Sequence, residues 1–468
     1  MEKLKKPSSL SVSWSSKDPP VPARQWVSVE AGRKLPSDRK IESVCHLPAK
    51  TLAWLRGAFQ AGLTRSDGWA TPGDPAAMMA AHLYKRGVAC RPETQSSISS
   101  SGTYPVKVAS DVFRPQEFGT QAIFLVDHRV AAKWKHLGFP PERTVVVRTS
   151  ESRKSLATVG EILEQSLPIS NRLKDNTWYL VGGGILGDLG GFAASLVEAP
   201  FVQVPTTILA MVDSSVGGKT GVNFAPYGKN QVGAFAFPQQ VLIYPDFLST
   251  LPSRHLRGGA AECLKHGLLA ENPQLLEQTT AQLRGEDWLG LASSLIELVE
   301  VKVRVVARDP MEVGERAVLN LGHTLAHALE AESHSQVPPG RILEHGEAVG
   351  LGLLFALILS EETGVMKVGE SRSLRHSVLE ANILPAVDEL EYRIGWRLTA
   401  RGLFPALYRH ILNDKKRVSL SDVSTTHWVL LKKRGKVHKI KPGSFLAPVD
   451  RAVLEKSWKR FVQELKIP

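Results

Sequence analysis

The sequence predicts an α/β domain followed by an all-α domain. Between residues 103 and 247, short apolar runs alternate with helical patterns, whereas long amphipathic segments dominate the chain after about residue 247. The first hundred residues are rich in Ser, Pro and basic residues and end in a Ser-rich segment typical of a flexible linker. We therefore expect a poorly ordered extension over residues 1–100, an α/β domain over 101–248 and a helical domain over 249–468.

Five segments of the α/β domain are predicted as strands because they are short, apolar and rich in β-branched or aromatic residues. They are Tyr104–Val108, Ala122–Val126, Thr144–Val147, Thr177–Val181 and Phe201–Val204. Helices are expected between strands, at residues 156–165 and 192–196. Strands that alternate with helices form a parallel sheet, so this domain is predicted to be Rossmann-like.

The second half is predicted to contain five long helices. They are expected at residues 260–270, 288–308, 319–331, 347–362 and 371–381. The most apolar stretch, Ala348–Ser360, is shorter than the ~20 residues of a membrane span, so it is expected to be a buried helix. Lys432–Lys439 alternates like a strand and is expected to form a solvated hairpin.

The composition of the 468 residues, 43% apolar and 22% charged, is typical of a soluble globular protein. Three cysteines cannot form a disulfide framework, which indicates a reducing compartment. We expect a cytoplasmic protein, or a plastid protein if the Ser- and Lys-rich start is a transit peptide. The net charge of +12 favours an anionic small molecule, and the pattern predicts neither a nucleic-acid partner nor a membrane partner.

A glycine-rich turn follows the fourth predicted strand. Gly182–Gly184 end that strand, and Gly187–Asp188 are expected to open the next element. Glycines let the backbone approach a dinucleotide pyrophosphate, although a plain tight turn remains the alternative because the pattern is not G-x-G-x-x-G. Asp127, at a strand end, has the acceptors for a ribose diol, and Thr206–Thr207 offer hydroxyls to a cofactor. The alternative for each is a helix N-cap.

Two histidines and a carboxylate in the helical part form a common ligand set for zinc with one open position. The candidates are Glu262, His323 and His345. His323 follows a glycine near a helix start, where a ligand is easily presented, which leaves His327 for proton transfer or phosphate contact. Lys265 shares a helix face with Glu262. Packed core histidines are the alternative interpretation.

A second group of residues has the chemistry of an anion site. Four lie on glycine-rich segments, and three more donors follow in the helical part; they are Asp213, Lys219, Lys229, Asn230, Lys302, Arg316 and Asn320. The spacing of Arg316, Asn320, His323 and His327 predicts one polar face of a single helix. Because the flanking residues are apolar, we expect this face to line a cavity, with a solvated face as the alternative.

Eight stretches together form a specific pattern. They are GGGILGDLGGFAASL, QVPTTILAMVDSSVGGKTGVN, GKNQVGAF, FLSTLP, GGAAECLKHG, GERAVLNLGHTLAHALEAE, EHGEAVGLG and NDKK. Through them, residues 103–455 resemble the 3-dehydroquinate synthases of the sugar phosphate cyclase family. Gly217–Lys219 and the paired histidines favour this branch over cyclases of sedoheptulose 7-phosphate, although Lys219–Asn223 has features of the latter.

The resemblance implies a Rossmann-like NAD-binding domain, a helical metal- and substrate-binding domain, a site in the cleft between them and a homodimer. It implies zinc, with cobalt as the alternative metal, on Glu262, His323 and His345. The implied NAD contacts are Asp127, Glu151, Lys154, Gly184, Ile185, Leu186, Gly187, Asp188, Thr206, Thr207, Lys219, Lys229, Phe247, Leu248, Ser249 and Thr250. The implied catalytic and substrate contacts are Asp213, Lys219, Asn230, Lys265, Lys302, Arg316, Asn320, His327 and Lys415.

The implied reaction converts 3-deoxy-arabino-heptulosonate 7-phosphate to 3-dehydroquinate and phosphate, in the shikimate pathway. The chain would then be an NAD- and metal-dependent carbon–oxygen lyase. The alternatives are another cyclase acting on sedoheptulose 7-phosphate, a catalytically impaired relative and a metal-dependent polyol dehydrogenase. The main departure from the family pattern is a missing Arg-Gly pair, because Leu196–Pro200 is about two residues short. Losing that phosphate contact would cost roughly 1.5–3 kcal/mol.

Overall fold

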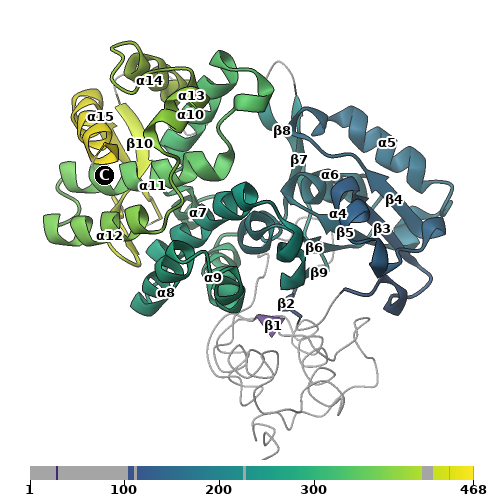
Figure 1. Ribbon diagram of the computed structural model, residues 1–468. Helices are drawn as coiled ribbons and strands as arrows, with labels where there is room; N and C mark the ends of the chain where they lie inside the picture. The colour runs from purple at the N-terminus through teal and green to yellow at the C-terminus, as the bar shows by residue number, and fades with distance from the viewer. Residues whose placement is uncertain are drawn as a thin grey trace, which may run out of the picture. The chain divides into compact units, whose positions relative to one another are not determined.

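A computed structural model of the chain describes residues 28–29, 104–109, 113–224, 228–413, 425–441 and 443–466 (Figure 1). The chain forms two compact units. The first comprises Met1–Leu251 and Lys302–Met311, and the second comprises Pro252–Val301 and Glu312–Pro468. Apart from Ser28–Val29, the predicted N-terminal extension lies outside the described residues. The domain bounds given above stay predictions.

A seven-stranded sheet in the order β1-β2-β9-β6-β5-β3-β4 forms the centre of the first unit. Its strands are β1 (Ser28–Val29), β2 (Val106–Val108), β3 (Ala122–Asp127), β4 (Thr144–Val147), β5 (Thr177–Gly182), β6 (Phe201–Pro205) and β9 (Gln240–Ile243). β1 is antiparallel to β2, and every other neighbouring pair is parallel. The five predicted strands are therefore confirmed, and β9 is a strand that the sequence analysis did not predict.

Alternate residues of the central strands are buried on opposite faces of the sheet. On one face, Leu125 and Leu180 belong to the apolar core that includes residues of α5 (Leu156–Ser166) and α6 (Gly184–Leu196). On the other face, Phe124 and Tyr179 join an aromatic cluster, with 5.4 Å between their ring centroids. Burial on both faces is the usual state of a parallel sheet, and it explains why these strands are almost wholly apolar.

The second unit is mainly helical. Its helices are α7 (Ser253–Leu269), α8 (Pro273–Arg284), the first part of α9 (Trp288–Arg308), α10 (His323–Gln336), α11 (His345–Glu362), α12 (Val368–Glu380), α13 (Val387–Ile394), α14 (Leu403–Asn413) and α15 (Arg451–Leu465). It also contains two small sheets. They pair β10 (Thr425–Val429) with β13 (Leu446–Asp450), and β11 (Leu431–Lys433) with β12 (Lys436–Val437). The second pair is the predicted hairpin.

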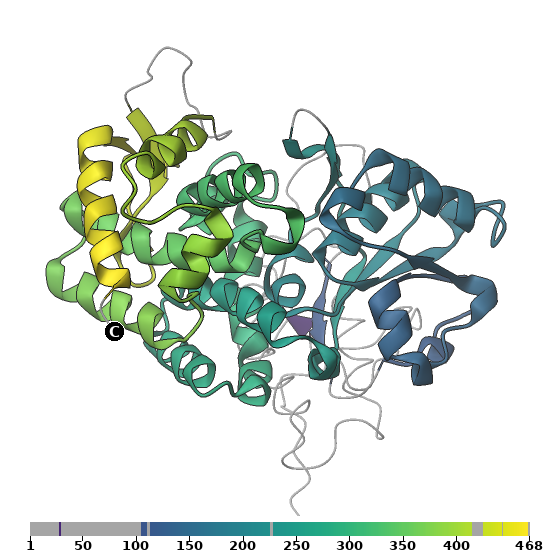
Figure 2. The same cartoon turned by 45° about the horizontal axis from the view of Figure 1, so that its top comes forward.

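Helix α11 is the central helix of this unit (Figures 1 and 2). Residues 346–360 are all buried, as predicted for the apolar stretch, and the helix packs against α7, α10, α12 and α15. In the described part of the chain, no helix combines the length and the apolarity that crossing a membrane requires.

Two glycine contacts allow α7, α10 and α11 to approach closely. A Cβ atom on Gly346 of α11 would lie 1.8 Å from the carbonyl oxygen of Gly258 in α7. A Cβ atom on Gly352 of α11 would lie 2.0 Å from the carbonyl oxygen of Gly322, the N-cap of α10. The absence of side chains at these positions therefore sets the separation of the three helices.

The predicted continuous helix over residues 319–331 is wrong. A 3-10 helix covers Glu315–Asn320, the chain then turns at Gly322 with a φ of 80°, and α10 begins at His323. Arg316 and Asn320 therefore do not share one helix face with His323 and His327. The positive φ is the physical cause, because it cannot continue a right-handed helix.

Candidate active site

Three helices of the second unit bring the predicted metal ligands together. Glu262 lies in the middle of α7, His323 is the first residue of α10, and His345 is the first residue of α11. Each residue offers one ligand atom, and these atoms all lie within 4.8 Å of one another. The glycine contacts described above lie beside both histidines, so the crossing of the helices determines the geometry of the three side chains.

The two distances from Glu262 to the imidazoles fit a tetrahedral metal ion. Ligands at about 2.0–2.2 Å from zinc lie about 3.3–3.6 Å from one another in a tetrahedron. Here Glu262 Oε1 lies 3.4 Å from His323 Nε2 and 3.5 Å from His345 Nε2. The side chains therefore need little movement to surround a zinc or cobalt ion. Metal binding by these three side chains stays a prediction.

Strong electrostatic interactions connect this cluster. Burial alone would raise the pKa of Glu262, but the Lys265 ammonium and the two imidazoles lower it well below its ordinary value, so the carboxylate is ionised. Burial, together with the Lys265 charge, lowers the pKa of His323 to about 4. A neutral imidazole beside an ionised carboxylate is the protonation state that a divalent metal requires.

A backbone carbonyl orients one imidazole, and a carboxylate orients the other. His323 Nδ1 lies 3.1 Å from the carbonyl oxygen of Leu321, and His345 Nδ1 lies 3.1 Å from Glu330 Oε2. Both contacts leave Nε2 directed at Glu262. Although burial opposes it, the Glu330 and Glu262 carboxylates raise the pKa of His345 to about 10. Sequence reasoning missed Glu330, although its place seven residues after His323 puts it on the same face of α10.

Other predicted residues of the second unit lie on nearby elements. Lys265 is fully buried and forms an ion pair with Glu262 Oε2. His327 lies one turn after His323 on α10, and its ring centroid is 6.4 Å from that of His345. Arg316 and Asn320 lie on the 3-10 helix directly before His323. Lys415 lies outside the described residues.

In the first unit, the carboxyl ends of three adjacent strands gather the predicted dinucleotide contacts. β3 ends at Asp127, β5 ends at Gly182, and Thr206–Thr207 directly follow β6. Gly182 is packed closely, since a Cβ atom there would lie 3.2 Å from Asp127 Cβ. The Gly182 carbonyl also accepts a hydrogen bond from the Thr206 amide at 3.0 Å. This edge is where ligands usually bind to open α/β sheets.

The helix after the glycine turn begins earlier than predicted. Gly183 is the N-cap of α6 and Gly184 its first residue, so Gly184–Asp188 form the first turn and the start of the second. The prediction that Gly187–Asp188 open this element is therefore wrong, because tertiary packing overrides the low helix propensity of glycine. No acidic residue lies in the first turn, which leaves the positive end of the helix dipole suited to an anion.

Some of these residues also have local structural roles. The Asp127 carboxylate accepts a hydrogen bond from the Arg129 amide at 2.8 Å and another from the Thr149 hydroxyl, so it does cap a helix, namely α4 (His128–Lys133). The Thr207 hydroxyl accepts a hydrogen bond from the Ala210 amide at 3.2 Å. The N-cap alternatives therefore hold, and the ribose and cofactor contacts of these side chains stay predictions.

A buried ion pair connects three further predicted residues. Lys154 Nζ lies 2.5 Å from Asp188 Oδ2 and 2.5 Å from Asn230 Oδ1. Burial raises the pKa of Asp188, against the opposing effect of the Lys154 charge. Glu151 accepts a hydrogen bond at 2.8 Å from the amide of Asn223, on the hairpin of β7 (Lys219–Phe224) and β8 (Gly228–Phe235). Asn223 was not among the predicted contacts.

The remaining predicted residues of this unit are dispersed over its surface and interior. Lys302 donates a hydrogen bond to Asp213 Oδ1 at 2.8 Å. Lys219 and Lys229 lie on the hairpin strands and are exposed. In the Phe247–Thr250 segment, Phe247 and Leu248 are buried, whereas the Thr250 hydroxyl accepts a hydrogen bond from the Trp134 indole at 2.9 Å.

Comparison with known structures identifies the fold. A 2-deoxy-scyllo-inosose synthase complexed with carbaglucose-6-phosphate, NAD+ and Co2+ matches 80% of this chain and 98% of its own, with a TM-score of 0.65 and 20% identity. The 2-epi-5-epi-valiolone synthase of Streptomyces hygroscopicus, with NAD+ and Zn2+ bound, matches 80% of this chain and 99% of its own, with a TM-score of 0.60 and 23% identity. The predicted Rossmann-like unit and helical unit are thus the two parts of this fold.

Sequence comparison is more specific. Residues 144–258 match the model described as 3-dehydroquinate synthase N-terminal, and residues 259–417 match that described as 3-dehydroquinate synthase C-terminal. The 3-dehydroquinate synthase of Xylella fastidiosa strain M23 is 39% identical over 282 residues, covering 58% of this chain and 75% of that protein. The 3-dehydroquinate synthase of Xanthomonas axonopodis pv. citri strain 306 is 43% identical over 236 residues, which cover 49% of this chain and 63% of that protein. The chain therefore belongs to the 3-dehydroquinate synthase family of enzymes.

Proposed function

We propose that this protein is a 3-dehydroquinate synthase, which converts 3-deoxy-arabino-heptulosonate 7-phosphate to 3-dehydroquinate and phosphate with NAD+ and a divalent metal. The observation that supports it best is the cluster of Glu262, His323 and His345 in a chain of this family. Relatives of 36–43% identity have this name. We also propose that the protein forms a homodimer.

The second unit would hold the metal. Glu262 Oε1 lies at tetrahedral spacing from both imidazoles, and zinc, or cobalt in its place, would accept the three side chains with one position left for substrate. The first unit would bind NAD+ at the carboxyl edge of its sheet, with the pyrophosphate at the start of α6 and the ribose near Asp127. When bound, NAD+ supplies reversible hydride transfer, and the metal supplies polarisation of an oxygen.

The protein's own side chains would bind and orient the substrate. We assign the phosphate to Lys219, Asn230, Arg316, Asn320 and His327, and the carboxylate and hydroxyl groups to Lys265 and Lys302. Asp213 would orient Lys302, because the two form an ion pair at 2.8 Å. Cations and amides suit these roles, since charge-assisted hydrogen bonds to phosphate and carboxylate are strong. Lys415 is assigned to substrate from the resemblance alone.

A direct assay tests the proposal. The purified full chain, with 3-deoxy-arabino-heptulosonate 7-phosphate, NAD+ and zinc, should release phosphate and 3-dehydroquinate in equal amounts without net formation of NADH. Phosphate release only from sedoheptulose 7-phosphate would assign the chain to another cyclase activity, and net NADH from a polyol would indicate a dehydrogenase. Either result would reject the proposed reaction.

A ligand substitution tests the metal site within the same assay. His345→Ala should lose bound zinc and turnover together, because it removes one of three protein ligands. His376→Ala is the matched control, since His376 lies on α12 of the same unit with a side chain that is 70% exposed. Retained zinc in His345→Ala would reject the assignment of this ligand.

One observation favours a second candidate, a relative with impaired catalysis. The turn between α6 and β6 has no arginine, and its sequence is Val197-Glu-Ala-Pro200. Glu198 in this turn has a φ of 55°, and the Ala199 amide returns to the Ala194 carbonyl at 2.9 Å, so the turn is short and closed. Binding of NAD+ and zinc without phosphate release would support this candidate over the first.

A further inference from the structure

Glu330 is a buried carboxylate that sequence reasoning did not identify and that is directed at a candidate metal ligand. It lies on α10 with 8% of its surface exposed. Its Oε2 lies 3.1 Å from His345 Nδ1, while His345 Nε2 lies 3.5 Å from Glu262 Oε1. The imidazole of His345 therefore lies between two carboxylates, one on each side of the ring.

His345 depends on such a partner more than His323 does. The His323 side chain is 10% exposed and its Nδ1 contacts the backbone carbonyl of Leu321, so packing and the backbone both fix that ring. The His345 side chain is 35% exposed, so packing restricts its rotation less. Without an acceptor for Nδ1–H, this ring is free to rotate and to place its proton on either nitrogen.

We propose that Glu330 is a positioning residue for the metal site. Its carboxylate accepts a hydrogen bond from Nδ1–H of His345, and this contact directs Nε2 toward the metal. The inference rests on the proposed function, because it assumes that the cluster binds a metal. A carboxylate behind a ligating imidazole fixes its tautomer and raises its basicity, and loss of such a partner typically weakens metal binding about 10- to 100-fold. Glu330 also connects the two histidine ligands, since α10 contains His323 as its first residue.

Zinc affinity measures this role without reference to turnover. The full-length protein is freed of metal, and its zinc dissociation constant is determined by competition with a chromophoric chelator. Glu330→Gln keeps the size and an acceptor oxygen but removes the charge, whereas Glu330→Ala removes both. We expect dissociation constants about 10- to 100-fold above wild type, with the larger loss in the alanine variant. The visible absorption of the cobalt-substituted protein should change in both variants, because the orientation of one ligand changes.

Glu332 offers a matched control on the same helix. It is buried like Glu330, at 3% exposed, and its Oε2 lies 2.8 Å from His410 Nε2, but that histidine is not a candidate ligand. Glu332→Gln should bind zinc within about 2-fold of wild type. Thermal unfolding of the metal-free variants tests whether each of them is folded.

The outcomes separate the inference from the function on which it rests. Equal zinc affinity of wild type, Glu330→Gln and Glu330→Ala would overturn the positioning role while leaving the proposed function in place. An equal loss in Glu332→Gln would also overturn it, because the effect would then reflect the stability of α10. If the wild-type protein itself bound no zinc, the metal-dependent function would fail, and the inference with it.

Discussion

Asp127 combines a structural role, seen in its hydrogen bonds, with the proposed role in binding NAD+. Its Oδ1 accepts the Arg129 amide at 2.8 Å, and its Oδ2 accepts the Thr149 hydroxyl. The side chain is buried, so these two contacts replace the water that would solvate it. The two roles depend on different properties of the side chain. Capping the helix requires one acceptor oxygen, whereas binding both hydroxyl groups of a ribose requires the two strong acceptors of an ionised carboxylate.

Substitution of Asp127 should therefore separate stability from cofactor affinity. Asp127→Ala should lower the free energy of unfolding by about 1 kcal/mol, the usual cost of losing an N-cap. Asp127→Asn keeps one acceptor and should lose clearly less stability, yet both variants should bind NAD+ more weakly. Urea unfolding and titration calorimetry measure the two quantities. If Asn and Ala proved equally destabilising, the cap would not be the main structural contribution of this residue.

The contact between helices α7 and α11 determines the relative positions of two of the three candidate ligands, Glu262 and His345. Gly346 directly follows His345, and Gly258 lies one turn before Glu262 on the face that meets α11. Arg254 fixes the start of α11 as well, because it pairs with Glu347 at 3.0 Å and with Glu344 at 3.1 Å. Glu344 and Glu347 form the capping box of this helix, so Arg254 connects the start of α7 to the first turn of α11, which contains His345.

Gly346→Ala should disrupt this contact. The added methyl would meet backbone 1.8 Å away, so the helices must separate, and overpacking of this kind typically costs about 1–3 kcal/mol or more. Zinc affinity should fall as well, because Glu262 and His345 move apart. Gly369→Ala is the control, since this glycine in α12 has no heavy atom within 4 Å of the added Cβ and should be neutral or slightly stabilising. Thermal unfolding and zinc titration measure both effects.

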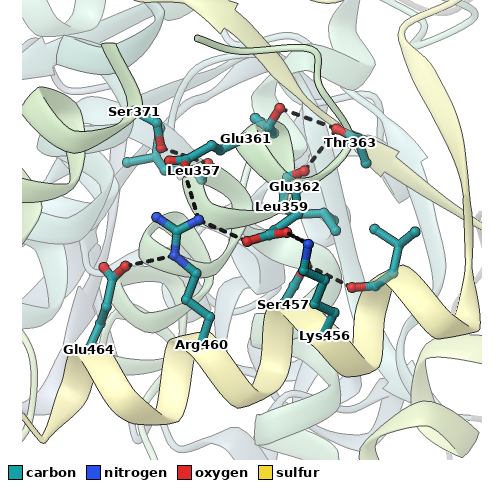
Figure 3. A network of polar contacts seen from close by, with 12 residues as sticks. Leu357, Leu359, Glu361, Glu362, Thr363, Ser371, Lys456, Ser457, Arg460 and Glu464 are labelled. Atoms are coloured by element: carbon teal, nitrogen blue, oxygen red, sulfur yellow. Dashed lines mark hydrogen bonds and ion pairs between the residues drawn. The ribbon is translucent and has the colours of Figure 1, made fainter. Parts of the chain in front are cut away.

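A network of charges fastens the C-terminal helix α15 to the end of α11 (Figure 3). Arg460 of α15 pairs with Glu361 and Glu362 at 2.8 Å each, and Arg375 of α12 pairs with Glu361 at 2.5 Å and with Glu464 at 2.9 Å. The side chains of Arg375 and of the two α11 glutamates are at most 10% exposed, so solvent screens this network less than an ordinary surface pair.

The network predicts a loss of stability in acid. Although burial opposes it, the Arg460 and Arg375 guanidinium groups lower the pKa of Glu361 from 4.5 to about 2. Because the folded state favours the ionised form, its contribution is fully present above about pH 4.5 and is lost as the pH falls toward 2. Glu361→Gln should cost about 1–3 kcal/mol at pH 7 and should reduce the slope of stability against pH in this window.

Denaturant unfolding at several pH values measures that slope. Glu455→Gln is the control, because Glu455 pairs with Arg451 on the same α15 but is 43% exposed, and its loss should change stability by less than about 0.5 kcal/mol. An unchanged slope in Glu361→Gln would show that other carboxyl groups determine the acid sensitivity of the protein.

Across the whole molecule, the sequence predicted the features that depend on local pattern or on rare residue types. Five strands of the sheet were predictable from short apolar runs with both faces buried, and the cluster of Glu262, His323 and His345 was predictable because few other residue types bind zinc. Features that depend on distant contacts were missed. The break at Gly322 results from packing against α11, and Glu330 resembles an ordinary helical glutamate until His345, fifteen residues later, is placed beside it.

Because the proposed zinc and NAD+ sites lie in different compact units, each of the two should protect a different part of the protein from hydrogen exchange. Under the proposed function, zinc alone should slow exchange in the helices that contain its ligands, around Glu262, His323 and His345, since binding favours the closed state of those helices. NAD+ alone should protect the carboxyl ends of β3 and β5 and the first turn of α6. Mass spectrometry of peptides from the full chain measures both patterns. Protection of α6 by zinc alone, with none in α7, α10 or α11, would contradict the assignment of the metal to the second unit.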